Sequence, residues 1–103
     1  MSEAVRANDA ESRYEIFVDD QLAGFADYRR HGSRADFVHT EIADEFGGRG
    51  LATELIRAAL DDARRRGWQV RPYCEFVKAF IAKNEDYLDL VTVELRGKFG
   101  LAP

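Results

Sequence analysis

The feature that most constrains the fold of this chain is a glycine-rich segment, Gly-Gly-Arg-Gly, at residues 47–50. Just before it, residues 34–42 show the two-residue period of a β-strand. Just after it, apolar residues fall on one face of a helix predicted over residues 51–66, which Gly67 ends. The glycines therefore mark a sharp strand-to-helix turn, where backbone amides and the positive end of a helix dipole favour an anion such as a phosphate.

The strand before the glycine segment is the third of three predicted strands. One of its faces is predicted to carry Phe37, His39 and Glu41, and the residues between them point the opposite way. The two earlier strands are predicted over residues 14–18 and 22–30, each followed by turn residues. The three strands are expected to form an antiparallel meander.

A short strand over residues 68–72 and a second helix that begins at Cys74 are predicted after the long helix. A strand, a helix and a returning strand favour a right-handed crossover. The chain is therefore expected to adopt an α/β fold of the α+β kind: a meander of three strands, a helix, a short strand and a second helix. Residues 13–103 form this single domain, and residues 1–12, which show neither period, are expected to be a flexible N-terminal tail.

Composition excludes several other classes of protein. A single cysteine excludes an internal disulfide, and two histidines far apart with that one cysteine give no ligand-spaced metal cluster. A net charge of −4 argues against a duplex nucleic-acid binder that relies on a cationic face. The first residues have no apolar run typical of a signal peptide or a membrane span. We expect a cytoplasmic protein with neither a nucleic-acid nor a membrane partner.

Strand, glycine turn, long helix, short strand and second helix, in this order, resemble the coenzyme A site of the GNAT acetyltransferase superfamily. Residues 38–40 (Val-His-Thr), 48–52 (Gly-Arg-Gly-Leu-Ala), 71–74 (Arg-Pro-Tyr-Cys) and 76–77 (Phe-Val) carry the resemblance. They are similar to the minimal, Yjdj-type branch of that superfamily, and the likeness spans about residues 14–91.

The resemblance implies that acetyl-CoA or coenzyme A binds as a cosubstrate and that no metal takes part. Pantetheine would pair with the edge of the third strand, and the pyrophosphate would lie on the amides of the glycine loop. Arg49 would contact a phosphate or remain a solvent-exposed arginine, and Gly47 stands where the superfamily usually has Gln or Arg. The residues assigned to the cofactor are Thr40, Ile42, Gly47, Gly48, Arg49, Gly50, Leu51, Ala52 and Asn84.

Acetyl transfer to an amine requires a base, because the nitrogen is largely ammonium at neutral pH. His39 has a suitable unperturbed pKa of ~6.5 and lies on the strand that lines the implied cleft. It is the candidate catalytic base, with a purely structural histidine as the alternative. Glu41 lies two residues further on, where it either acts through a water or attracts a cationic substrate, or is a solvated strand carboxylate.

Cys74 falls at the junction of the short strand and the second helix, close to where the implied cofactor sulfur would lie. A helix N-terminus lowers the pKa of a thiol, which makes an acyl-cysteine relay conceivable, whereas a free cysteine often only packs. Direct transfer is the favoured mechanism, with Cys74 near the thioester or the acceptor. Tyr73 is a candidate proton donor to the leaving thiolate.

The sequence therefore predicts an acetyl-CoA-dependent N-acetyltransferase that acts on an unidentified small-molecule or peptide amine. The alternatives are a CoA or acyl-CoA binding module with little turnover, and a small interaction domain whose glycine turn is only architectural. Glu41, Asp44 and Glu45, with the net charge of −4, favour a cationic acceptor such as a polyamine or a lysine-bearing compound. We expect a monomer or a weak homodimer.

Overall fold

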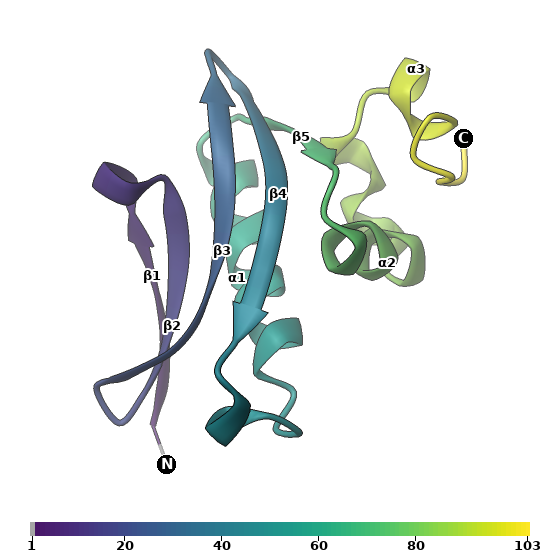
Figure 1. The fold of residues 1–103 in the computed structure, drawn as a ribbon. Helices are drawn as coiled ribbons and strands as arrows, with labels where there is room; N and C mark the ends of the chain where they lie inside the picture. Colours follow the sequence, from purple (N-terminus) through teal and green to yellow (C-terminus); the bar gives the residue numbers. More distant parts are fainter. Residues whose placement is uncertain (1) are drawn as a thin grey trace.

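A five-stranded sheet in the order β1-β2-β3-β4-β5 frames the structure, a computed structural model that describes residues 2–103 (Figure 1). The first four strands form an antiparallel meander, and β5 joins it by parallel pairing with β4. The α+β order predicted from the sequence is confirmed, with one further strand at the start. The strands are β1 (Glu3–Asn8), β2 (Arg13–Val18), β3 (Gln21–His31), β4 (Arg34–Ile42) and β5 (Gln69–Pro72).

The first strand, β1, corrects the expectation that residues 1–12 form a flexible tail. It pairs with β2 along its whole length, and a 3₁₀ turn, η1 (Asp9–Glu11), connects the two strands. As an edge strand β1 is held mainly by its backbone, and Val5 is its hydrophobic side chain that packs against the core. Its sequence therefore lacks the apolar alternation that predicts a half-buried strand. Met1 lies outside the described residues.

Helix α1 (Leu51–Arg65) lies across one face of the sheet and returns the chain to β5 (Figure 1). As predicted, it is followed by Gly67, whose φ of 74° is left-handed. Beyond β5 come α2 (Glu75–Lys83), the 3₁₀ segment η3 (Glu85–Leu90) and the short helix α3 (Val93–Arg96). Within the described part of the chain, none of these helices has the length and apolar character needed to cross a membrane. The buried face of α1 consists of Leu51, Leu55, Ile56, Ala59, Leu60 and Ala63.

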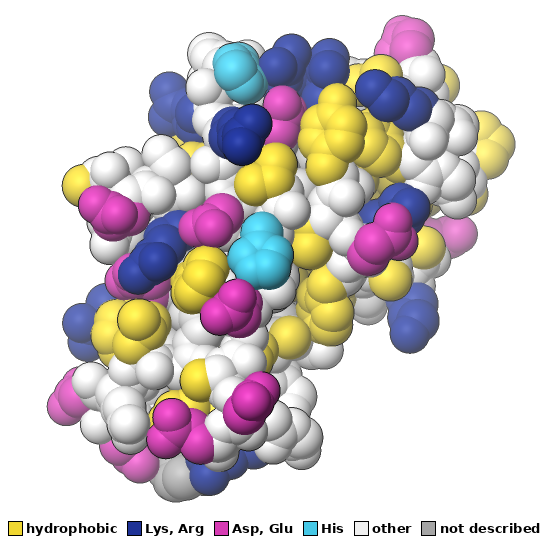
Figure 2. Space-filling view, viewed as in Figure 1, with side chains coloured by type: hydrophobic (Ala, Val, Ile, Leu, Met, Phe, Trp, Pro, Cys, Tyr) yellow, Lys and Arg dark blue, Asp and Glu magenta, His cyan; other side chains and the backbone are white. Residues whose placement is uncertain are grey.

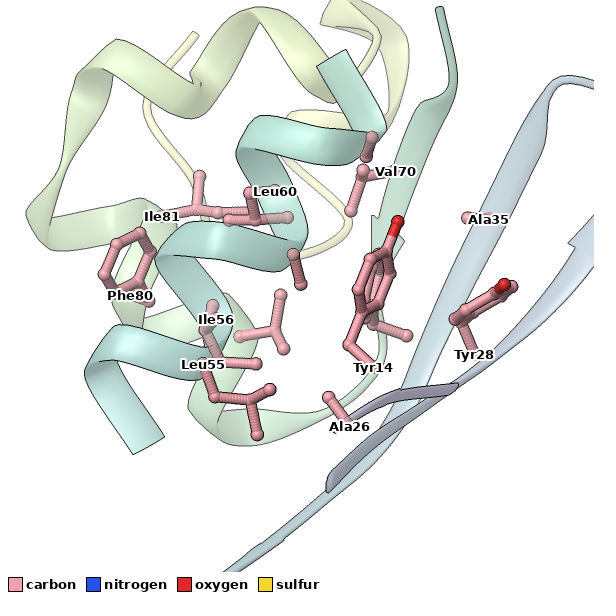
Figure 3. Close-up of a cluster of buried hydrophobic side chains, with 14 of the residues drawn as sticks. Tyr14, Ala26, Tyr28, Ala35, Leu55, Ile56, Leu60, Val70, Phe80 and Ile81 are labelled. Atoms are coloured by element: carbon pink, nitrogen blue, oxygen red, sulfur yellow. The ribbon is translucent and has the colours of Figure 1, made fainter. Parts of the chain in front are cut away.

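Aromatic side chains of the sheet meet α1 in the core, where Tyr14 of β2 lies at the centre (Figure 3). Its ring stacks on Phe37 at a centroid distance of 6.3 Å, and its hydroxyl donates a 2.7 Å hydrogen bond to Oδ2 of Asp62 on α1. Burial, reinforced by Asp62, raises the pKa of Tyr14 far above its ordinary value. The phenol therefore stays protonated, and its hydrogen bond ties the sheet to the helix.

Strand β4 contains a bulge at Val38. On β3, Asp27 pairs with His39 while the next residue, Tyr28, pairs with Phe37, so Val38 has no partner of its own. The bulge reverses the alternation: Phe37 is fully buried in the core, whereas His39 is exposed on the opposite face. The predicted common face for these two residues is therefore wrong, because the extra residue depends on pairing with β3 and leaves no mark in the strand's own sequence.

The parallel pairing of β4 and β5 is short. It joins Arg34–Phe37 to Gln69–Pro72, and the next link is a 2.8 Å hydrogen bond from the backbone N–H of Cys74 to the carbonyl oxygen of Phe37. From there β4 continues to Ile42 while the chain after β5 turns away into α2. The two strands thus diverge and leave one edge of β4 without a neighbouring strand.

We expect Tyr14→Phe to lower the free energy of unfolding by about 1–3 kcal/mol, because it removes a donor from a partly buried carboxylate. Urea unfolding measures the loss. Tyr87→Phe is the matched control, since Tyr87 donates a similar 2.7 Å hydrogen bond to Asp61 from a less buried position. A loss in the control as large as that in Tyr14→Phe would contradict the central role of the Tyr14–Asp62 bond.

Candidate functional site

The glycine loop joins η2 (Asp44–Phe46) to α1 and is anchored by the buried ring of Phe46. Gly48 and Gly50 have φ angles of 77° and 72°, in the left-handed region that favours glycine. A Cβ at either position would meet no atom within 4 Å, so the space beside the loop is open. Among residues 2–103 no side chain caps the start of α1. The first amides of α1 are therefore available to an anion at the positive end of the helix dipole.

The side chains of the loop differ in what they can offer a ligand. The guanidinium of Arg49 lies over the ring of Phe46 at 5.5 Å from its centroid, on the exposed side of the loop. Leu51 is only 2% exposed, so its backbone amide is the part that can reach a ligand, while Ala52 is half-buried. Gly47 has an extended backbone, with φ of −64° and ψ of 155°, which any residue adopts. The loop therefore presents backbone amides and one arginine.

A hollow of about 180 Å³ lies between the first turn of α1 and one face of α2. Asn84 lies at its edge, but its side-chain amide already donates a 2.8 Å hydrogen bond to the carbonyl oxygen of Phe80. Two residues that line the hollow, Thr53 and Lys83, were not predicted as site residues. The spacing of Phe76, Phe80 and Lys83 on one helix face is the sequence signal that places Lys83 beside the two rings. The lining residues are Thr53, Phe76, Ala79, Phe80, Lys83 and Asn84.

The diverging edge of β4 carries Thr40 and Ile42, both half-buried. Oγ1 of Thr40 lies 3.3 Å from Sγ of Cys74, which occupies the position just before α2. This contact spans the gap between β4 and the chain after β5. An extended ligand with amide groups could add to the unpaired edge as a further strand would. Within residues 2–103, no three His, Cys, Asp or Glu side chains gather in a way that could hold a metal ion.

His39 and Glu41 meet on the other face of β4. Nε2 of His39 lies 3.1 Å from Oε1 of Glu41, and the two side chains are 55% and 60% exposed. The ring of Phe25 flanks the imidazole at a centroid distance of 6.0 Å. Helix α1 covers the opposite face of the sheet (Figure 1), and Figure 2 shows charges of both signs among hydrophobic side chains on this one. The pair is open to a solute that approaches from this side.

The structure thus brings the predicted residues together in two pairs. Thr40 lies between His39 and Glu41 in the chain and contacts Cys74, while its two neighbours contact each other on the opposite face. Successive side chains of a strand point to opposite faces. The two pairs are therefore separated by the thickness of a single strand.

Tyr73, the candidate proton donor, contacts the C-terminal segment of the chain. It is 44% exposed, its ring meets Phe99 edge-on at 5.1 Å, and its hydroxyl accepts a 3.4 Å hydrogen bond from Nζ of Lys98. Hydrogen bonds from Arg71 and from Lys98 lower the pKa of Tyr73, because both cations favour the phenolate. Nothing in the sequence between these residues signals that they would meet.

The five-stranded sheet with an open glycine turn at the start of α1, beside two parallel strands that diverge, is the GNAT class of α+β fold. Residues 13–90 match the family of GCN5-related N-acetyl-transferases, and the chain belongs to that family. Protein NATD1 of Bos taurus is 34% identical over 58 residues, which are 55% of this chain and 51% of that protein. The chain thus spans about half the length of the curated relatives it matches.

Two solved structures share the fold. A GCN5-like protein from Staphylococcus aureus superposes with a TM-score of 0.66 at 23% identity, over 86% of this chain and 87% of its own. The PaiA N-acetyltransferase from Thermoplasma acidophilum, solved in complex with coenzyme A, superposes with a TM-score of 0.50 at 14% identity. That match covers 72% of this chain and 48% of the other. At these identities the likeness shows the fold alone.

As pH rises, we expect Tyr73 to ionise before the other tyrosines, since burial raises the pKa values of Tyr14, Tyr28 and Tyr87 while two cations lower that of Tyr73. The near-ultraviolet absorbance of phenolate follows the titration. Tyr73→Phe should remove the earliest step, and Lys98→Gln should move it to higher pH. An earliest step that persists unchanged in Tyr73→Phe would contradict this arrangement.

Proposed function

We propose that this chain is an acetyl-CoA-dependent N-acetyltransferase that transfers the acetyl group directly to a small amine. The proposal rests on how the candidate residues are arranged around strand β4. The glycine loop and the Thr40–Cys74 contact lie toward the diverging edge of β4, and the His39–Glu41 pair lies on its open face. A reacting group held at that edge would come within reach of a base on the far side.

The residues that would hold the cofactor fit its chemistry. The open, uncapped start of α1 suits a pyrophosphate, since backbone amides and the helix dipole both favour negative charge. The edge of β4 beyond Phe37 suits the amide groups of pantetheine. Lys83, the last residue of α2, lines the hollow beside the first turn of α1 and would add a cation near the pyrophosphate. Bound acetyl-CoA would supply an activated thioester, from which an unprotonated amine can take the acetyl group.

His39 is the residue best suited to remove a proton from the amine. When its Nε2–H donates to Glu41, Nδ1 keeps the lone pair that accepts the proton. The Glu41 carboxylate then holds the ring in place and stabilises the imidazolium that forms. Because both side chains are exposed, a small amine in solution can approach them directly.

Cys74 and Thr40 occupy the other side of the strand. Their hydroxyl and thiol are 3.3 Å apart, so one donates to the other and the second keeps its hydrogen. That hydrogen can be donated to a sulfur that gains negative charge as it leaves. Tyr73 is less suited to this role, because its exposed ring and hydroxyl lie against Phe99 and Lys98 of the C-terminal segment. Direct transfer needs no covalent bond to Cys74, whereas an acyl-cysteine relay would leave an acetyl group on its sulfur.

Coenzyme A and acetyl-CoA at 100 times their dissociation constants should each raise the free energy of unfolding by about 2.7 kcal/mol, as measured by thermal shift or chemical denaturation. Gly50→Glu should abolish this stabilisation, because it places a carboxylate where a phosphate must lie. Gly32→Glu is the matched control: Gly32 is also left-handed, with φ of 64° and open space around it, but it lies in the turn between β3 and β4. Equal stabilisation of both variants would show that the site lies elsewhere.

His39→Ala should lower turnover of an amine acceptor by roughly 10²–10⁴ while leaving the affinity for CoA nearly unchanged. His31→Ala, at the last residue of β3, is the control and should leave turnover unchanged. An unchanged rate for His39→Ala at saturating acceptor would remove His39 from the mechanism, and CoA binding without turnover of any amine would favour a binding module. Intact-mass measurement in the same mixtures tests direct transfer, since a kinetically competent acetyl adduct on Cys74 would contradict it.

A further inference from the structure

A cationic cluster lies at the β5 end of the sheet, formed by Arg71 of β5, Tyr73 after it and Lys98 near the C-terminus. Nζ of Lys98 lies 3.4 Å from the hydroxyl of Tyr73, 5.3 Å from the centroid of its ring and 5.6 Å from that of Phe99. Two aromatic rings therefore hold the ammonium in place beside the tyrosine hydroxyl. The hydroxyl accepts from Lys98 and keeps its own hydrogen for a further acceptor.

Within the described residues 2–103, no carboxylate forms an ion pair with Arg71. Arg71 pairs in register with Asp36 of β4, but that carboxylate is already bound by Arg34, with hydrogen bonds of 3.1 and 3.4 Å, and lies 3.9 Å from His31. Among residues 2–103, Nε of Arg71 is buried and has no hydrogen-bond partner. A buried donor without a partner costs free energy until a ligand or a water accepts its hydrogen. The cluster thus offers unused donors and excess positive charge to an anion.

We infer that Arg71, Tyr73 and Lys98 form a subsite for a carboxylate of the acceptor, so that the acceptor is a small amino-carboxylate and not a simple amine. The inference rests on the proposed function, because the amine of the same molecule would lie at the His39–Glu41 pair. A planar guanidinium, an ammonium and a phenol O–H are together the donors that a carboxylate prefers.

The spacing along β4 indicates which amine of such an acceptor reacts. Asp36, the register partner of Arg71, lies on the same open face as His39, and the β3 partners of Asp36 and His39 are Arg29 and Asp27. These partners are two residues apart, which is about 7 Å at the rise of a strand, and Arg71 lies one strand further to the side, which adds ~4.8 Å in that direction. The flexible side chains of the cluster shorten the span that the ligand must cover. An α-amine lies next to its carboxylate, so it would not reach the His39–Glu41 pair while the carboxylate binds the cluster. The cluster and the His39–Glu41 pair together therefore suit an acceptor whose terminal amine is several carbons away from its carboxylate, as in free lysine.

The experiment compares lysine with cadaverine, which has the same terminal amine and carbon chain but no carboxylate. Each is titrated into the whole 103-residue chain saturated with CoA, and the NMR shifts of the backbone amides of residues 71, 73, 74 and 97–99 are followed. Lysine should bind at least about tenfold more tightly than cadaverine, as expected for one charge-assisted contact. Lys98→Gln and Arg71→Lys should each reduce this preference. Arg65→Gln is the control, since Arg65 is exposed on α1 and pairs with Asp62.

Equal affinities of lysine and cadaverine for the wild-type chain would overturn the inference, as would a preference that survives both Lys98→Gln and Arg71→Lys. Lys98 is exposed, so its variant is expected to fold even if Arg71→Lys does not. The proposed function is tested separately by the NMR chemical shifts of the Gly48 and Gly50 backbone amides, which should change when CoA is added. Without such a response the proposed function fails, while the same titrations in the absence of CoA still decide whether the cluster recognises a carboxylate.

Discussion

The loss of pairing between β4 and β5 after Phe37 is the constraint on which the rest of the site depends. Pro72 is the last residue of β5 and has no backbone N–H, so it donates no hydrogen bond to β4. The N–H of Cys74 makes one more bond to Phe37, and α2 then turns the chain away. On its other side β4 stays paired with β3 as far as Ile42. The unpaired edge is therefore still supported on one side, because β3 remains paired where β5 does not.

The bulge at Val38 gives this edge its two chemically different sides. Without the extra residue, Phe37 and His39 would share a face, and either the core would lose a buried ring or the imidazole would be buried with it. With it, the aromatic core ends at Phe37 and polar side chains begin at His39. The same β4 strand thus closes the core over its first half and presents Thr40 and the His39–Glu41 pair over its second half.

The elements predicted correctly from the sequence are those whose own residues show a periodicity or require a particular backbone conformation. The glycine turn, the helix over Leu51–Arg65 and the strand Arg34–Ile42 each have a local period or a backbone requirement, and all three were predicted. Sequence reasoning failed where pairing partners decide the outcome. Strand β1 is held mainly by its backbone, and the bulge at Val38 exists only relative to β3. Lys98 reaches Tyr73, which also interacts with Arg71, only after the C-terminal segment folds back.

Only the thickness of one strand, β4, separates the Thr40–Cys74 contact from the His39–Glu41 pair. A ligand bound along the diverging edge and a second ligand bound at the His39–Glu41 pair would approach β4 from opposite sides, so neither would block the route of the other. Binding of the two in either order would then be sterically open. Two ligands bound in this way would be kept apart by the β4 backbone itself.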